Sequence, residues 1–230
     1  MLLYKGKAKS VYSTDNSEVV RIEFRDDATA FNGVKKAVVD SKGATNCKIS
    51  AHFMHLMESF GIPTHFIDKI SDTEQLCHKL EILPVEVVVR NVAAGSICRR
   101  LGLEKGTKFK WPIVELFYKS DELDDPMIND EHAIIFDWAE DYQLKHMKNT
   151  ALQVNDILKE FWETKGITLV DFKIEFGKDP RGMLMLADEI TPDGSRLWDN
   201  ESGESLDKDV FRQGIRDLQE TYDEVLRRVF

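Results

Sequence analysis

Cysteine is scarce in this chain, and its distribution excludes two kinds of small scaffold. The 230 residues include three cysteines, Cys47, Cys77 and Cys98, which lie far apart and form no C-x-x-C pair. An odd, dispersed set supports neither a disulfide framework nor a cysteine-rich zinc site. The six histidines are also scattered, and His52 and His55 have no further ligand pattern beside them. We therefore expect a protein without disulfides and without zinc.

Long apolar runs and internal repeats are absent as well. No stretch approaches the roughly 20 apolar residues that a membrane-spanning helix needs. The first residues, Met1–Lys5, reach a charged side chain too soon for a signal peptide. These features predict a cytoplasmic protein with no membrane partner.

An excess of positive charge is the third absence. The chain has 31 Lys and Arg against 41 Asp and Glu, a formal net charge of -10. Nucleic-acid-binding domains are usually basic, so we expect no nucleic-acid partner. With 42% hydrophobic and 31% charged residues, the composition is that of a folded globular protein. A site for anionic ligands would have to gather its positive charge locally.

The order of the predicted elements favours an α+β fold over alternating βαβ units. β-rich runs fill most of the first 40 residues, and Val85–Val89 predicts a short buried strand. Apolar residues at helical spacing predict helices near Asn46, over Ser96–Leu101, from about Asp141 to Lys165, and at the C-terminus.

The middle of the chain gives less regular signals. Ser71–Glu74 has Ser and Glu three residues apart, the pattern of a helix start. Residues 102–135 are predicted to be irregular because Pro112 and Pro126 interrupt them. A break near Leu80–Pro84 would separate a mainly antiparallel β lobe, residues 1–80, from an α+β lobe, residues 81–230.

The most informative segment is the acidic strand Leu169–Gly177. Side chains alternate between the faces of a strand, so Asp171, Lys173 and Glu175 share one face. A solvated edge would explain that face equally well if it were considered alone. The next strand, however, is apolar and ends in Asp188, where an unpaired buried charge is costly. This favours a functional role for the acidic pair.

Hairpin geometry brings Glu175 and Asp188 together. Asp179–Gly182 has the residues of a type I turn. If that turn closes the hairpin, Lys173 faces Asp188, and Glu175 becomes its diagonal neighbour about 7–8 Å away. Two carboxylates at that separation can hold Mg²⁺ together with phosphate oxygens. The register is an assumption, because other turn types are more usual in tight hairpins.

Three further segments suit anionic ligands. Tyr4–Lys9 places Lys7 and Lys9 around small residues that let a ligand approach the backbone, although a solvated edge strand explains it too.

The second segment, Pro84–Ser96, ends a buried strand with Arg90 and opens a short helix at Ser96, where free N–H groups can bind an anion. A surface arginine and a simple N-cap are equally compatible with this pattern. The third segment, Thr191–Asp199, follows Asp188 closely and carries Arg196, whose fork matches carboxylate and phosphate.

Together these segments resemble a known family. Leu169–Gly177 and Pro84–Ser96 are similar to the two signature segments of SAICAR synthetases. Tyr4–Lys9, Ala187–Glu189 and Gly194–Asp199 match in order and spacing, so the resemblance covers nearly the whole chain. It implies a compact bacterial-type enzyme with a two-lobed fold, distantly similar to protein kinases, and with ATP between the lobes.

The resemblance also implies roles for individual residues. ATP would lie near Lys7 and Lys9, with its adenine against the backbone of Leu80, Glu81 and Ile82. Mg²⁺ would be bound by Glu175 and Asp188. The ribotide substrate would be held by Arg90, Ser96 and Arg196. Catalytic positions in the same cleft would be Lys119, Asp171 and Lys173.

The implied reaction joins CAIR, a 5-aminoimidazole-4-carboxylate ribotide, to L-aspartate. ATP would phosphorylate the carboxylate, and the amine of aspartate would displace phosphate to give SAICAR, ADP and phosphate. Mg²⁺, lysine and arginine would act by positioning and charge neutralisation. The family also suggests a homodimer.

Two other functions stay open at this point. A small-molecule kinase of similar architecture would also use lysines and an acidic hairpin, but Arg90 and Arg196 better suit an acceptor bearing carboxylate and phosphate. A non-catalytic nucleotide-binding module would keep the adenine contacts and lose the acidic pair, yet both Glu175 and Asp188 are present.

Overall fold

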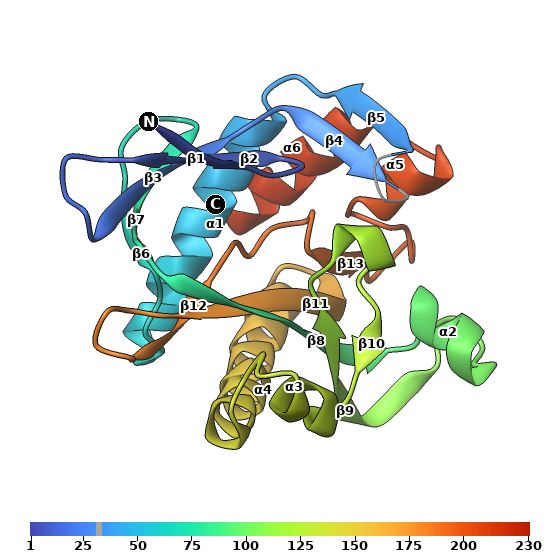
Figure 1. Cartoon of the computed structure of the whole chain (residues 1–230). Helices are drawn as coiled ribbons and strands as arrows, with labels where there is room; N and C mark the ends of the chain where they lie inside the picture. The colour runs from blue at the N-terminus through green and yellow to red at the C-terminus, as the bar shows by residue number, and fades with distance from the viewer. Residues whose placement is uncertain (31–33) are drawn as a thin grey trace.

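Two antiparallel β-sheets frame the chain, and helices pack on each of them, giving an α+β architecture in this computed structural model (Figure 1). The structure describes residues 1–30 and 34–230. The first sheet has the strand order β1-β2-β3-β7-β6. Its strands are β1 (Leu2–Lys5), β2 (Lys9–Ser13), β3 (Val19–Phe24), β6 (Phe66–Lys69) and β7 (Glu74–His78).

The second sheet has the order β10-β9-β8-β11-β12, and β13 also pairs with β11. Its strands are β8 (Glu81–Val92), β9 (Lys108–Tyr118), β10 (Met127–Ile128), β11 (Ile167–Lys178), β12 (Leu184–Ala187) and β13 (Ser195–Asp199). A separate two-stranded ladder joins β4 (Asp27–Ala30) to β5 (Lys35–Val38).

Helices cover both sheets. Helix α1 (Lys42–Ser59) packs on the first sheet and beside the C-terminal helix α6 (Leu218–Val229), whereas α4 (Asp141–Thr164) packs on β8, β9 and β11 (Figure 1). The shorter helices are α2 (Ser96–Leu101), α3 (Asp130–Ile135), α5 (Asp209–Gln213) and the 3₁₀ turn Asp121–Leu123. Among the described residues, none of these helices has the length and apolar character to span a bilayer.

Helix α4 follows directly from its sequence. At its start the Gln143 side chain accepts the Glu140 N–H at 2.9 Å, and Gly166, in the left-handed region with φ of 69°, ends it as predicted. Its buried stripe repeats at helical spacing and consists of Leu144, Met147, Ala151, Val154 and Leu158.

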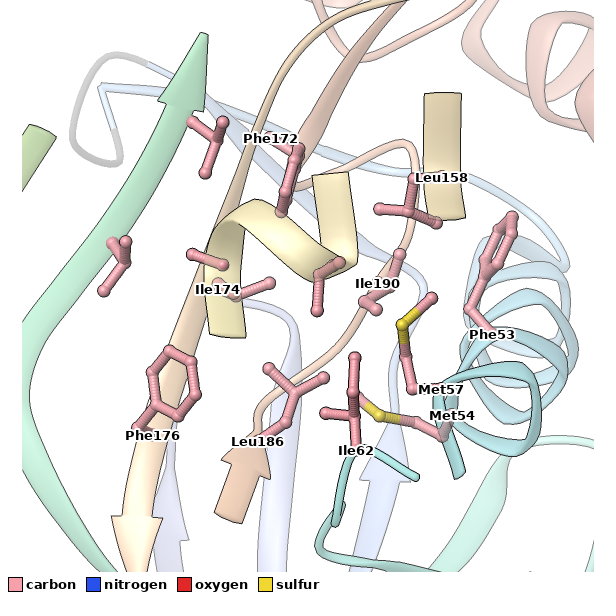
Figure 2. Packing of buried hydrophobic residues seen from close by; sticks show 14 of the residues in the cluster. Phe53, Met54, Met57, Ile62, Leu158, Phe172, Ile174, Phe176, Leu186 and Ile190 are labelled. Atoms are coloured by element: carbon pink, nitrogen blue, oxygen red, sulfur yellow. The ribbon is translucent and has the colours of Figure 1, made fainter. Parts of the chain in front are cut away.

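The main apolar core lies where α1, α4 and the second sheet meet. Phe172, Ile174 and Phe176 of β11 point into it, opposite Leu158 of α4 and Met57 of α1 (Figure 2). The alternation predicted for this strand is thus confirmed for Phe172, Ile174 and Phe176, and the charged residues between them occupy the other face. The prediction is wrong for Val170, which is buried in a separate cluster with Val92 and Ala94, because a bulge between Leu169 and Asp171 interrupts the alternation.

One edge of β11 is shared between two partners. The first half of β11 pairs with β13, and its second half pairs with β12, while β8 lies along its other edge. The loop Asp188–Gly194 therefore leaves this edge after Ala187, opposite Glu175, and returns at Ser195, opposite Phe172. The Gly194 carbonyl accepts the Lys173 N–H at 2.9 Å, which fixes the returning end.

The predicted hairpin register is wrong by one residue. The Asp179–Gly182 turn does form, with the Gly182 N–H donating to the Asp179 carbonyl at 2.9 Å. Gly182 itself, with φ of 81°, is the extra residue of a bulge, so Asp179 pairs with Met183 instead. Glu175 consequently faces Ala187. Asp188 follows Ala187 directly, so Glu175 remains its near neighbour even in the shifted register.

The helix predicted to start at Ser71–Glu74 is not formed. These residues make the turn between β6 and β7, where the Ile70 N–H donates to the Glu74 carbonyl at 3.0 Å. Burial alternates along β7, with Gln75 and Cys77 fully buried, so the period of two determines the local structure. The Ser and Glu pattern fits the turn as well as it fits a helix cap.

Residues 102–135 are also more regular than predicted, because β9 crosses them. Pro112 is tolerated in this strand since it lies beside the bulge opposite Arg90 and Val92, outside the short pairing with β10. The strand predicted at Val85–Val89 is likewise longer, running from Glu81 to Val92 as β8.

The close approach of β11 to the segment before β8 gives a testable requirement at Gly177. A Cβ atom there would lie 2.7 Å from the Leu80 Cβ and 3.1 Å from the Glu81 carbonyl oxygen. We expect Gly177→Ala to lower the free energy of unfolding by about 1–3 kcal/mol, measured by urea denaturation. Gly194→Ala is the matched control, because its nearest atom would be 3.6 Å away. Equal stability of the two variants would contradict this packing argument.

Candidate active site

A cleft of about 660 Å³ lies between the two sheets. Both sheets contribute to it, together with the loop Asp188–Gly194. Among the residues predicted for the site, it brings together Lys7, Lys9, Leu80, Ile82, Lys119, Lys173, Glu175 and Asp188. Glu81 lies between Leu80 and Ile82 in the sequence, but its side chain is exposed and lies 3.4 Å from the Lys178 ammonium.

One end of the cleft is lined by carboxylates and lysines from the second sheet. Glu175 of β11 lies directly opposite Glu86 of β8. Two facing carboxylates repel each other, and lysines compensate them. Lys173 donates to Glu86 at 2.6 Å and to Glu175 at 3.2 Å, while Lys119 donates to the other Glu175 oxygen.

The two sheets are joined across the cleft by Lys9 and Asp188. The Lys9 ammonium donates to Asp188 and lies 3.4 Å from Glu189. Burial alone would raise the pKa of Asp188, but the cations of Lys9 and Lys173 outweigh it and hold that pKa well below its usual range. Asp188 is therefore an ionised carboxylate, and it is presented by a left-handed backbone with φ of 65°.

His65 lies in the same cleft and stays neutral. Burial and the neighbouring Lys9 ammonium lower the pKa of His65 to about 4. The positive charge of the cleft therefore comes from its lysines.

A buried ion pair fixes the loop Asp188–Gly194, through Asp193 in the lining of the cleft. Lys42 at the start of α1 lies 2.6 Å from Asp193, and the Tyr222 hydroxyl of α6 donates to the other Asp193 oxygen. Burial would raise the pKa of Asp193, but Lys42 and Lys208 lower it to about 2. Charges far apart in the sequence thereby anchor one loop.

The predicted residues Arg90, Ser96, Asp171 and Arg196 do not line this cleft; they form a second group, here called the arginine cluster. Arg90 donates to Asp171 at 2.7 Å and to Ser96 at 3.3 Å. Arg196 donates to the same Asp171 oxygen at 2.9 Å. Strand register explains the contact, since Asp171 of β11 pairs with Arg90 on one side and with Arg196 on the other.

Two further acidic side chains hold the arginine cluster in place. Glu115 of β9 accepts from Arg90 at 2.6 Å, and Asp209 of α5 accepts from Arg196 at 2.8 Å. Gly95 lies against the Arg196 guanidinium, because a Cβ atom there would come within 2.6 Å of it. Glycine at this position lets the segment before α2 close over the arginine.

The cleft and the arginine cluster share one polar face. Asp171, Lys173 and Glu175 alternate along β11, so Asp171 of the arginine cluster and Glu175 of the acidic pair are four residue steps apart, about 13 Å. An extended substrate can thus reach both groups.

Several residues of the site were not predicted from the sequence: Glu86, Glu115, Glu189, Asp193, Lys208 and Asp209. One of them carried a signal, because Glu86 is a lone charge within an apolar buried strand. Lys208 stands between two aspartates, which is typical of a solvated loop.

Asp171 accepts hydrogen bonds from both Arg90 and Arg196, and this gives a prediction on stability. Asp171→Asn removes the negative charge between Arg90 and Arg196, both largely buried. We expect a loss of about 3 kcal/mol in the free energy of unfolding, measured by urea denaturation, because two buried cations lose their shared partner. The control Asp141→Asn breaks an exposed ion pair with Lys145 and should leave the midpoint almost unchanged. A variant as stable as the parent would show that Glu115 and Asp209 suffice.

A lysine-lined cleft that contains two carboxylates, with arginines on the same face, defines an enzyme that handles anionic, phosphorylated substrates. A family model described as SAICAR synthetase matches residues 2–229. The phosphoribosylaminoimidazole-succinocarboxamide synthase of Magnetococcus marinus is 50% identical over 230 residues, covering 99% of this chain and 95% of that protein.

Solved structures agree. The crystal structure of phosphoribosylaminoimidazole-succinocarboxamide synthase from Ehrlichia chaffeensis has a TM-score of 0.97 at 44% identity, covering 100% of this chain and 98% of that chain. A SAICAR synthetase in complex with ADP has a TM-score of 0.96 at 49% identity, covering 98% of this chain and 96% of that chain.

The chain belongs to the SAICAR synthetase family. It is an ADP-forming ligase of purine biosynthesis, and the reaction of the family is the ligation of CAIR and aspartate. The kinase alternative is not favoured.

Proposed function

We propose that this chain joins CAIR to L-aspartate through an acyl phosphate formed in the cleft between the two sheets. The observation that carries the proposal is the meeting of Glu175 and Asp188 with Lys9, Lys119 and Lys173 in one cleft. Lysines and carboxylates in this arrangement suit phosphoryl transfer, in which catalysis is mainly positioning and charge neutralisation.

ATP is proposed to lie between the lobes, residues 1–80 and 81–230. Its phosphates would meet Lys7 and Lys9, and its adenine would meet the backbone at Leu80–Ile82. Four of these positions line the cleft: Lys7, Lys9, Leu80 and Ile82. The related structure that contains ADP supports nucleotide binding in this fold.

The acidic pair fits Mg²⁺. Glu175 and Asp188 are both largely buried, and they face cationic partners in the structure. The described residues contain no group of three or more His, Cys, Asp or Glu side chains arranged for a metal. Two carboxylates completed by phosphate and water are what Mg²⁺ prefers. When bound there, Mg²⁺ would neutralise negative charge on the phosphates of ATP.

CAIR is proposed to bind along the polar face of β11. The arginine cluster, through Arg90, Ser96 and Arg196, would hold the ribotide part, and Asp171 would orient both arginines. The carboxylate of CAIR would then lie toward Lys173 and Lys119, which the strand spacing places near the acidic pair.

The chemistry divides into two displacements. A carboxylate oxygen of CAIR attacks the γ-phosphorus of ATP, and ADP leaves. The amine of aspartate then attacks the acyl carbon, the C–N bond forms, phosphate leaves, and the amine loses its proton. Lys119 and Lys173 would stabilise the negative charge that develops on the transferred groups. No nucleophilic side chain is needed.

We also propose, from the family resemblance, that the enzyme works as a homodimer in the cytoplasm. Its partners would be the small molecules CAIR and L-aspartate, together with Mg²⁺ and ATP.

The first test is the dependence of ADP release on L-aspartate. With CAIR and Mg²⁺·ATP present, we expect ADP to accumulate only when L-aspartate is added, with one succinocarboxamide formed per ADP, because the acyl phosphate needs the amine to turn over. Coupled spectrophotometry measures ADP, and chromatography measures the product. Rapid ADP release that ignores aspartate would sink the ligase proposal and favour a kinase or a hydrolase.

The second test addresses the acidic pair. Asp188→Asn keeps a side chain that tolerates the left-handed backbone at this position but removes the charge. We expect kcat to fall at least ~100-fold, with an unchanged circular dichroism spectrum. The thermal midpoint should fall, because Lys9 loses its carboxylate partner. Asp141→Asn on α4 serves as the control and should retain full activity. Full activity of Asp188→Asn would overturn the metal assignment.

A further inference from the structure

Lys208 differs from three other lysines that line the cleft. Lys9, Lys119 and Lys173 each donate to a carboxylate oxygen within hydrogen-bond distance. In the part of the chain that the structure describes, the nearest carboxylate oxygen to the Lys208 ammonium belongs to Asp193, at 3.7 Å. The Lys208 side chain is only 11% exposed, and it lines the cleft.

Asp193 is already committed to other partners. The oxygen that faces Lys208 lies 2.6 Å from Lys42, and the second oxygen accepts from Tyr222. One carboxylate charge is therefore shared by two buried cations, Lys42 and Lys208. A second anion at the Lys208 ammonium would balance this excess.

The electrostatics of the ammonium agree with this geometry. Burial lowers the pKa of Lys208, and the cations of Lys42 and Arg212 lower it further, against the opposing pull of Asp193 and Glu189. A buried cation without a full counterion is costly, so binding of an anion at this position is favourable.

The backbone holds Lys208 firmly in place. Asp207 before it is fully buried and accepts the Leu197 N–H at 2.8 Å, while Asp209 after it binds Arg196. Gly194, which also lines the cleft, binds the Lys173 N–H through its carbonyl. Lys208 is thus fixed on the segment that links the arginine cluster to the loop after the acidic pair.

The other anionic groups of the reaction already have cations. The proposed contacts to ATP are Lys7 and Lys9, and those to CAIR are the arginine cluster, Lys119 and Lys173. The remaining anion is the amino-acid co-substrate, which carries two carboxylates and must approach the acyl carbon from a side that these groups leave open.

We propose that the Lys208 ammonium binds a carboxylate of the amino-acid co-substrate, an α-amino dicarboxylic acid. This inference rests on the proposed function. Lys208 thereby becomes a specificity-determining residue for the second substrate, and its partial contact with Asp193 keeps the ammonium directed into the cleft before that substrate binds.

The test compares Lys208→Met with the parent enzyme in steady-state kinetics. We expect the KM for L-aspartate to rise roughly 10- to 100-fold, the range for a lost hydrogen bond to a charged group, while the KM values for CAIR and ATP stay within about twofold. Lys208→Arg should recover most of the loss, because it restores the positive charge. Lys145→Met, which removes a lysine from an exposed ion pair, is the matched control.

L-asparagine identifies which carboxylate is bound. If Lys208 holds the side-chain carboxylate, the parent enzyme prefers aspartate over asparagine, and Lys208→Met loses most of that preference. If Lys208 holds the α-carboxylate, the variant loses efficiency with both amino acids equally. Both results support the proposal.

Two outcomes overturn it. One is an unchanged KM for aspartate in Lys208→Met. The other is an equal rise in the KM values for L-aspartate, CAIR and ATP, which would mean that Lys208 only supports Asp193. A parent enzyme that turns over without aspartate would instead sink the proposed function, so the two failures are distinguishable.

A measurement on the parent enzyme covers the case in which Lys208→Met does not fold. Lysine acylation followed by peptide mass spectrometry should show that L-aspartate slows modification of Lys208, compared with sodium chloride at equal ionic strength. Lys145 should react equally fast in both solutions. Identical Lys208 rates with and without aspartate would also overturn the proposal.

Discussion

A charge removed from water needs an opposite charge beside it, and strand β11 meets that requirement three times on one face. Asp171 lies between two arginines, Lys173 lies between two glutamates, and Glu175 receives two lysines. On the opposite face Phe172, Ile174 and Phe176 anchor the core. Because the alternation of a strand is fixed, any slip of β11 would place these charges in the core and destroy fold and site together. The strand therefore couples the stability of the enzyme to the geometry of its active site.

The same face links the two groups of the site. Asp171 of the arginine cluster and Glu175 of the acidic pair lie on one strand, which keeps their separation constant. Such rigidity serves an enzyme whose task is mainly to align anions and to neutralise them. The acidic residues behind the arginines, Glu115 and Asp209, hold the guanidinium groups in a defined orientation, at the cost of removing several charges from water.

The sequence was most informative where apolar residues recurred with the period of a strand or a helix and where charged residues stood within such a segment. The alternation of β11 and the stripe of α4 were predictable because burial follows the period of the element. The hairpin register was not, since it depended on Gly182 adopting a left-handed conformation that a type I turn does not require. The turn at Ser71–Glu74 shows that short-range capping chemistry fits more than one backbone. Asp193 and Lys208 escaped prediction because their significance arises from Lys42 and Tyr222, distant residues that only the tertiary structure brings to them.

The loop Asp188–Gly194 leaves and rejoins the same edge of β11, with both ends held by strand pairing and with Asp193, near its second end, held by Lys42. Its length is therefore set by the distance along β11 between Glu175 and Phe172, the residues opposite its two ends. An insertion or deletion in this loop would therefore change the lining of the cleft. The exposed hairpin tip around Arg181 and Gly182 has no such constraint and can accept insertions. We therefore expect the hairpin tip around Arg181 and Gly182 to tolerate tags, labels and insertions, and the loop Asp188–Gly194 to tolerate none.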